Sequence, residues 1–150
     1  MSETNPYRIF VTHLWAEDED YLRVFEFLED VPNFYYRNVA NPDAPPAANA
    51  EGARELLRAQ IGQTEVVIAL AAQYTRDAAA LQFQLVLAAA TKKRIILMRP
   101  FGSNQVLPKA LTQHAQEILD WDKRALVAAI RRLTRGEGGP QWDTVEFKLY

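Results

Sequence analysis

Two glutamines, Gln82 and Gln84, stand in an uncharged run, AAALQFQLVLAAA, at residues 78–90. The run predicts a helix, and positions i and i+2 of a helix point in different directions. At most one of the two amides can therefore face a given pocket. A buried amide also needs hydrogen-bonding partners, because an unpaired polar group in an apolar surrounding is costly. We expect one of these two glutamines to belong to a functional site.

Other residues that could bind a ligand come directly after the segments that we predict to be strands. Ligands of open α/β sheets bind at the carboxyl ends of the strands. The candidates in this position are Thr12, His13, Trp15, Asn38, Asn41 and Tyr74. Aromatic rings can stack on a nucleobase or nicotinamide ring, and amides and hydroxyls can bind its edges. The sequence therefore predicts a pocket for a nucleotide.

Several common chemistries lack their residues in this chain. The turn after the first predicted strand, THLWAEDED, has no glycine, which argues against a G-x-G-x-x-G dinucleotide loop and against a P-loop. The serines are Ser2 and Ser103, and neither stands in a nucleophile elbow. Without cysteine, and with two histidines, the chain offers no convincing zinc site. We expect no metal.

The elements that must position the candidates alternate along the chain. Apolar or β-branched runs predict strands, and helical spacing of apolar residues predicts helices. Strands are expected at residues 7–12, 34–39, 64–71, 93–98 and 117–121, and helices at residues 16–30, 51–62, 78–90, 108–115 and 122–134. This alternation predicts an α/β three-layer sandwich with a mostly parallel, five-stranded sheet of the flavodoxin-like kind. The proline-rich residues 40–50 predict a loop.

Composition narrows the class of protein. The 150 residues are 49% hydrophobic and 24% charged, which suits one domain, expected at residues 1–135. Residues 136–150 contain three glycines and a proline and predict a tail or an added edge strand. A net charge of −2 argues against nucleic acid as a partner. No apolar run reaches the roughly 18–20 residues of a membrane span, and no signal peptide is evident, so a cytoplasmic protein without a membrane partner is expected.

The order and spacing of several segments resemble a bacterial TIR-like domain of the flavodoxin-like subfamily that supplies the TIR proteins of Thoeris anti-phage defence. The segments are RIFVTHLW, DYLRVFEFL, EVVIALAAQY, LQFQLVLAAATKKRIILMRPFG and EILDWDKRALVAAIRR. The resemblance implies an enzyme that cleaves NAD+, as a nucleosidase or an ADP-ribosyl cyclase, and makes a nucleotide signal for a downstream effector. NAD+ would be the substrate, with no separate cofactor. A homo-oligomer or larger assembly is also implied, and the uncharged helix at 78–90 favours it, since an exposed helix face normally carries charge.

The same resemblance assigns roles to the candidate residues. Laid on the family pattern W-I-x-x-E-[IL]-x-x-A, residues 80–88 read ALQFQLVLA, which lacks the tryptophan and places the catalytic glutamate on Gln84. A carboxylate there stabilises an oxocarbenium-like state, whereas an amide keeps the shape without the charge. Two interpretations stay open, namely an inactivated Glu-to-Gln form of an enzyme and a degenerate TIR scaffold or nucleotide-binding module. A third is an unrelated flavodoxin-like binding domain. The residues implied to bind the substrate are Thr12, His13, Trp15, Asn38, Asn41 and Tyr74.

Overall fold

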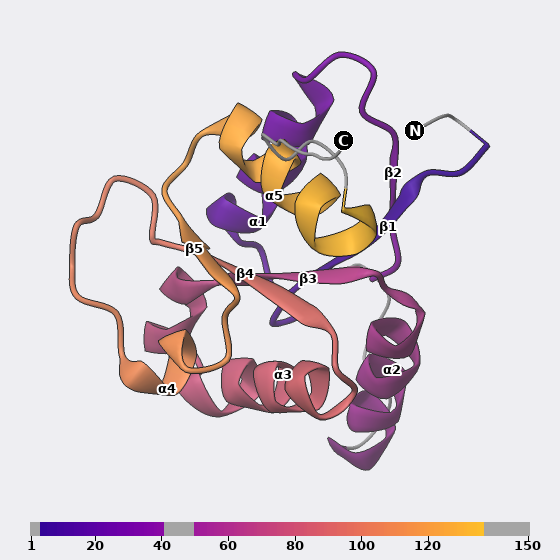
Figure 1. Ribbon diagram of the computed structural model, residues 1–150. Coiled ribbons are helices and arrows are strands. Elements are labelled where there is room, and N and C mark those ends of the chain that lie inside the picture. Colours follow the sequence, from indigo (N-terminus) through magenta and orange to yellow (C-terminus); the bar gives the residue numbers. More distant parts are fainter. Residues whose placement is uncertain (1–3, 41–49, 137–150) are drawn as a thin grey trace.

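A five-stranded parallel sheet forms the centre of the computed structural model, which describes residues 4–40 and 50–136 (Figure 1). The strands are β1 (Tyr7–Val11), β2 (Tyr36–Asn38), β3 (Val66–Leu70), β4 (Arg94–Met98) and β5 (Glu117–Leu119). The helices are α1 (Glu19–Glu29), α2 (Ala50–Gln63), α3 (Ala78–Ala90), α4 (Lys109–Thr112) and α5 (Lys123–Arg135), with the short 3-10 helix η1 (Ala71–Thr75) after β3. The predicted α/β sandwich with its five-stranded sheet is therefore confirmed. The tail predicted at residues 136–150 lies, apart from Gly136, outside the described residues, as does Asn41.

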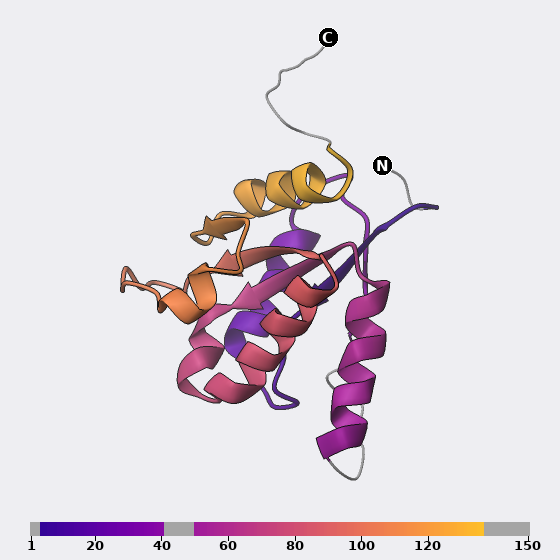
Figure 2. The ribbon, with the colours of Figure 1, turned by 60° about the horizontal axis from the view of Figure 1, so that its bottom comes forward.

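Helices cover both faces of the sheet, α1 and α5 on one side and α2, α3 and α4 on the other (Figures 1 and 2). Successive residues of a strand point to opposite faces. In β3, Ile68 packs into the cluster with α1 and α5, while Val67 and Ala69 pack into the cluster with α2 and α3. All five residues of β3 are fully buried, which explains why this segment reads as a continuous apolar run.

Aspartates begin three of the longer helices. In α1, α3 and α5, a carboxylate just before the first turn accepts hydrogen bonds from backbone N–H groups that have no partner within the helix. These capping residues are Asp18, Asp77 and Asp122. The spacing of the apolar residues predicts that Leu22 faces inward with Tyr21, Phe25 and Leu28, but Leu22 is 60% exposed and Val24 is buried instead.

The order of the strands creates a crevice at the carboxyl ends of the strands β1 and β3. The order is β2-β1-β3-β4-β5, so the chain runs outward from β1 to β2 and then returns past β1 to β3. As a result, the segments that leave β1 and β3 run to helices on opposite faces, α1 and α3 (Figure 1). Such a reversal of strand order is the place where open α/β sheets bind their ligands, outside the carboxyl ends of the strands.

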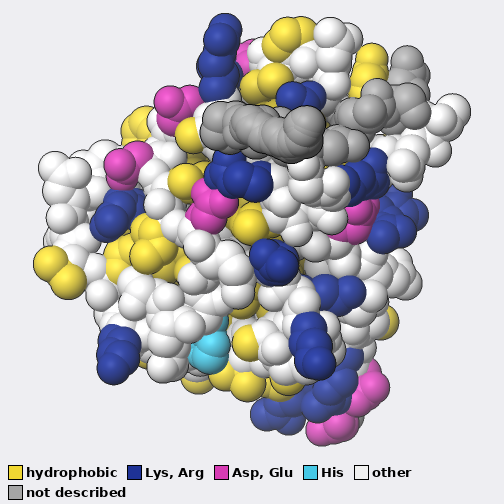
Figure 3. Space-filling model, in the orientation of Figure 1, with side chains coloured by type: hydrophobic (Ala, Val, Ile, Leu, Met, Phe, Trp, Pro, Cys, Tyr) yellow, Lys and Arg dark blue, Asp and Glu magenta, His cyan; other side chains and the backbone are white. Residues whose placement is uncertain are grey.

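The face drawn in Figure 3 carries charged side chains of both signs. On the described part of the face in Figure 3, basic and acidic side chains are interspersed. Among the described helices, none is long and apolar enough to cross a membrane. The expected absence of nucleic-acid and membrane partners stays a prediction. The expected homo-oligomer and the expected downstream effector also stay predictions.

Candidate functional site

A pocket of about 540 Å³ opens at the reversal of strand order, beyond the ends of β1 and β3. We call it the switch-point pocket. Three segments supply its walls: the turn after β1, the first turns of α2, and the start of α3. Its lining residues are His13, Leu14, Trp15, Ala53, Arg54, Leu57, Asp77, Ala79, Ala80, Phe83 and Gln84. The pocket thus combines three aromatic rings with one arginine and one carboxylate.

Gln84 is 1% exposed, and its amide is held by the backbone of His13. The His13 N–H donates to Gln84 Oε1 at 3.1 Å, and Gln84 Nε2 donates back to the His13 carbonyl at 2.8 Å. Nε2 also donates to the Ala80 carbonyl at 3.3 Å. This pair of bonds needs an acceptor and a donor side by side, which an amide offers at neutral pH and an ionised carboxylate does not. The position therefore suits an amide, and Gln82, which is half-buried, does not share it.

A second amide fixes the same turn from the other side. Gln73 of η1 is fully buried, and its Oε1 accepts from the Thr12 hydroxyl at 2.7 Å. Its Nε2 donates to the Thr12 carbonyl and to Asp18 Oδ2, each at 2.8 Å. The Thr12 hydroxyl in turn accepts from the Leu70 N–H at 3.0 Å. Residues 12–18 are thus fastened to the segment that follows β3, which holds His13 and Trp15 in place.

Two ring nitrogens at the pocket have no partner among the described residues, although both are buried. They are Nδ1 of His13 and Nε1 of Trp15. The two rings meet edge to face, with centroids 4.7 Å apart. Trp15 has a φ of +55°, a left-handed conformation that is strained for a bulky residue and often marks a functional site. These two rings also line a second hollow of about 440 Å³, with Glu17, Asp18 and Tyr21 among its walls.

Burial lowers the pKa of His13 below its ordinary value of 6.5, and the hydrogen bond with Gln60 opposes this only in part. The ring is therefore neutral near pH 7. The contact of Nε2 with Gln60 Oε1, at 3.4 Å, favours the tautomer with its proton on Nε2, because an amide oxygen accepts, and Nδ1 is the acceptor in that tautomer. Nδ1 of His13 is thus an acceptor and Nε1 of Trp15 a donor, and both atoms are shielded from solvent in this conformation.

The lowered pKa of His13 predicts a pH dependence of stability. In the range between its lowered pKa and 6.5, the unfolded chain binds a proton that the folded chain does not. The free energy of unfolding should therefore rise with pH through this range, by at most ~1.4 kcal/mol per pH unit from this group, and level off above it. Urea unfolding between pH 5 and 8 measures the slope. The His13→Gln variant should reduce it and His114→Gln should keep it; equal slopes in both variants would contradict the assignment to His13.

The structure brings together only some of the residues that the sequence singled out. Three of them, His13, Trp15 and Gln84, line the switch-point pocket. The other three described candidates, Thr12, Asn38 and Tyr74, lie outside its lining. Thr12 is occupied by the bonds to Gln73, and Asn38 donates to the Tyr21 hydroxyl at 3.0 Å. Their substrate-binding role stays a prediction.

Sequence reasoning missed three residues of the pocket, the charged Asp77 and Arg54 and the aromatic Phe83. Asp77 could have been found, because an aspartate directly before an apolar helical run is a typical N-cap and here also follows the third strand. Arg54 and Phe83 gave no such signal, since only the packing of α2 against α3 brings them to the same cavity. The described residues contain no group of three or more possible metal ligands, and the expectation of no metal stays a prediction.

The fold and the pocket define a flavodoxin-like α/β domain with a candidate ligand site at the reversal of strand order. Solved structures share this fold. A 2-deoxyribosyltransferase from the psychrotolerant bacterium Bacillus psychrosaccharolyticus matches with a TM-score of 0.58 and 12% identity, over 82% of this chain and 95% of that one. The CMP N-glycosidase of Clostridium botulinum matches with a TM-score of 0.51 and 16% identity, over 82% and 96%. No protein-family model and no curated protein matches the chain.

These findings overturn the TIR interpretation. The structural neighbours act on nucleosides or nucleotides and are not TIR domains, and no family model supports the motif resemblance. The assignments of NAD+ cleavage, of cyclic ADP-ribose signalling and of a role in Thoeris defence were wrong. The structural neighbours do not support the alternative of a degenerate TIR scaffold any better. A flavodoxin-like sheet imposes the same alternation of strands and helices on unrelated families, which is why the motifs misled.

Proposed function

We propose that the chain binds a nucleoside or a nucleotide in the switch-point pocket and cleaves its N-glycosidic bond. The observation that carries this proposal is the cavity at the reversal of strand order, in which the rings of His13, Trp15 and Phe83 meet the carboxylate of Asp77. The neighbouring structures, a deoxyribosyltransferase and a CMP N-glycosidase, support the choice of reaction. The proposal also keeps the expected cytoplasmic location, where free nucleosides and nucleotides occur.

The pocket residues suggest a division of roles. The rings of His13 and Trp15 would pack against the base, and Phe83 would offer a ring face for stacking. Arg54 supplies the positive charge at the pocket and Asp77 the carboxylate. In the reaction, the bond between C1′ and the base nitrogen breaks and its electron pair leaves with the base. Asp77 would stabilise the positive charge that develops on the sugar, and water would then add at C1′ and release a proton.

The proposal is tested by incubating the protein with a panel of ribo- and deoxyribonucleosides and their 5′-monophosphates. Chromatography should detect the release of free base from at least one class. If no base is released and no compound changes the tryptophan fluorescence of the protein, the proposed function is wrong.

Phe83→Ala should weaken the binding of the substrate found in that panel. Loss of one stacking face costs about 1 kcal/mol, so KM should rise roughly five- to tenfold with a smaller change in kcat. Phe101→Ala is the matched control, because Phe101 is an exposed phenylalanine outside the pocket, and it should leave KM unchanged. An unchanged KM in Phe83→Ala would remove this ring from the site.

A further inference from the structure

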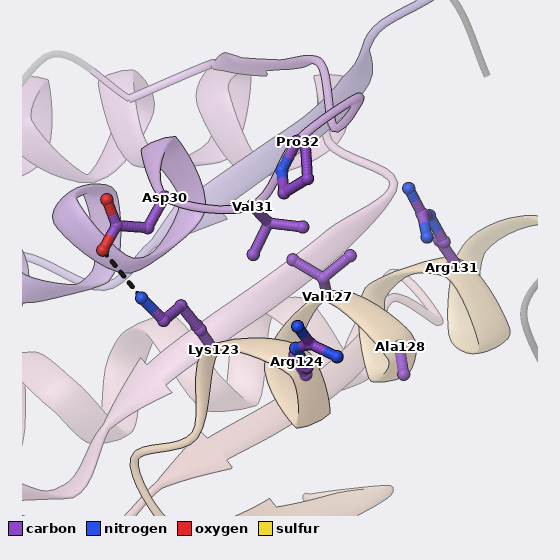
Figure 4. Close-up of a pocket in the computed structure, with 8 residues that line it drawn as sticks. All are labelled: Asp30, Val31, Pro32, Lys123, Arg124, Val127, Ala128 and Arg131. Carbon is purple, nitrogen blue, oxygen red and sulfur yellow. Dashed lines mark hydrogen bonds and ion pairs between the residues drawn. The ribbon is translucent and has the colours of Figure 1, made fainter.

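A groove of about 430 Å³ lies between α5 and the turn that follows α1, on the side of the sheet opposite α2 and α3 (Figure 4). Val31 from the turn and Val127 from α5 point toward each other across it. At one end, Lys123 Nζ is 2.8 Å from Asp30 Oδ2, the contact drawn as a dashed line. Arg131 lies at the other end. The groove shares no lining residue with the switch-point pocket and does not depend on the proposed function.

Two arginines of this groove keep their charge unbalanced. Among the described residues, no carboxylate lies within 4.0 Å of Arg124 or Arg131. The Arg124 side chain also makes no hydrogen bond within the described part of the chain. Arg131 donates to the Asn33 carbonyl at 3.5 Å, and its guanidinium lies 5.6 Å from the centre of the Phe34 ring. These contacts hold Arg131 in position without neutralising it.

The spacing of the arginines indicates the shape of a ligand. Arg124 and Arg131 are seven residues apart on α5, which places them on one face about 10.5 Å apart along the helix. Two separate anionic groups, one for each guanidinium, match this spacing. A matching ligand has two such groups and an apolar group between them, opposite Val31 and Ala128, whereas Val127 is buried beneath the groove. The carboxylates of Asp30 and Asp122 near the start of α5, and the net charge of −2, disfavour a dense polyanion such as nucleic acid.

We propose that the groove binds an acidic amphipathic helix of a partner protein. Two carboxylates seven residues apart on that helix would pair with Arg124 and Arg131, and a leucine-like side chain between them would pack on Val31 and Ala128. Because both ion pairs are at the surface, the complex is of modest affinity and weakens at high salt.

The test uses the full chain and a fluorescein-labelled, alanine-based helical peptide as probe. The peptide carries two glutamates seven residues apart with two leucines midway between them, and a control peptide has glutamine in place of both glutamates. Fluorescence anisotropy at low salt should show the glutamate peptide binding about tenfold more tightly than the control, as expected for two exposed ion pairs. The Arg124→Glu, Arg131→Glu double variant should lose this difference. Arg124→Gln, whose side chain has no partner to lose, should reduce it without affecting the thermal melting temperature.

A matched control separates the groove from general charge. The Arg37→Glu, Lys109→Glu double variant changes the net charge equally at two exposed positions outside the groove, and it should bind the glutamate peptide as the parent does. Equal binding of the two peptides would overturn the proposal. So would a control variant that loses as much affinity as the groove variant, because the attraction would then belong to the whole surface.

Discussion

Replacing Asp77 by asparagine is expected to lower kcat by a factor of about 10²–10⁴ while the chain stays folded. The carboxylate of Asp77 is the only one in the lining of the switch-point pocket, and among the described residues only the Ala80 N–H donates to it, at 3.1 Å. Asparagine caps a helix about as well as aspartate does, so α3 should still begin at the same residue. The charge that would stabilise the sugar in the transition state is removed, and KM should change little.

The matched control for this prediction is Asp122→Asn. Asp122 caps α5 as Asp77 caps α3, but it lies outside the pocket. Base release measured by chromatography should be normal in Asp122→Asn and nearly lost in Asp77→Asn, with similar melting temperatures in both. If Asp77→Asn retains full activity, the carboxylate is not catalytic, although the pocket could still bind the base through His13 and Trp15.

Most of the fold could be predicted because each element depends on local patterns. The buried β3 reads as five consecutive apolar residues, and α5 shows its inner face through Leu126, Val127 and Ile130. Strand order, in contrast, depends on long-range pairing, such as that of Ile9 with Val66, which no local pattern reveals. The exposure of Leu22 is a similar case, because helical spacing narrows the buried face but does not choose among neighbouring positions.

The site could be predicted only where local patterns in the sequence indicate it. His13 and Trp15 could be found because they follow the first strand, and parallel strands end at one edge of the sheet. Gln84 was found as an amide that needed partners, but the sequence could not show that those partners are the backbone atoms of His13. Resemblance to a family motif then assigned it the place of a catalytic acid. That role stays a prediction, and the bonds of the amide to the His13 backbone suggest a positioning role that a substitution can test.

Replacing Gln84 by glutamate is expected to destabilise the protein by about 2–4 kcal/mol near pH 7.5, instead of restoring an activity. A carboxylate could still accept from the His13 N–H, but its second oxygen would face the His13 carbonyl, where Gln84 now donates at 2.8 Å. The pKa of a carboxyl at this fully buried position should lie above its ordinary value near 4.3, because burial disfavours the charged form. The protonated acid has an O–H that can donate to the same carbonyl. The loss of stability should therefore be largest above the raised pKa and shrink as the pH falls toward 4.3.

Urea unfolding of the parent and of Gln84→Glu, at pH 7.5 and at pH 5, measures this difference. Gln82→Glu is the control, since Gln82 lies two residues away on the same helix and is half-buried with no side-chain bond to the described residues, so its stability should change by less than ~0.5 kcal/mol at either pH. The two glutamines of the apolar helix differ only in what surrounds them.

A Gln84→Glu variant as stable as the parent and faster in releasing base would show that the position tolerates a charge and acts on the substrate. A destabilised variant with a pH-dependent recovery would show that an amide is needed there, because one side chain must both donate to and accept from the backbone that carries His13.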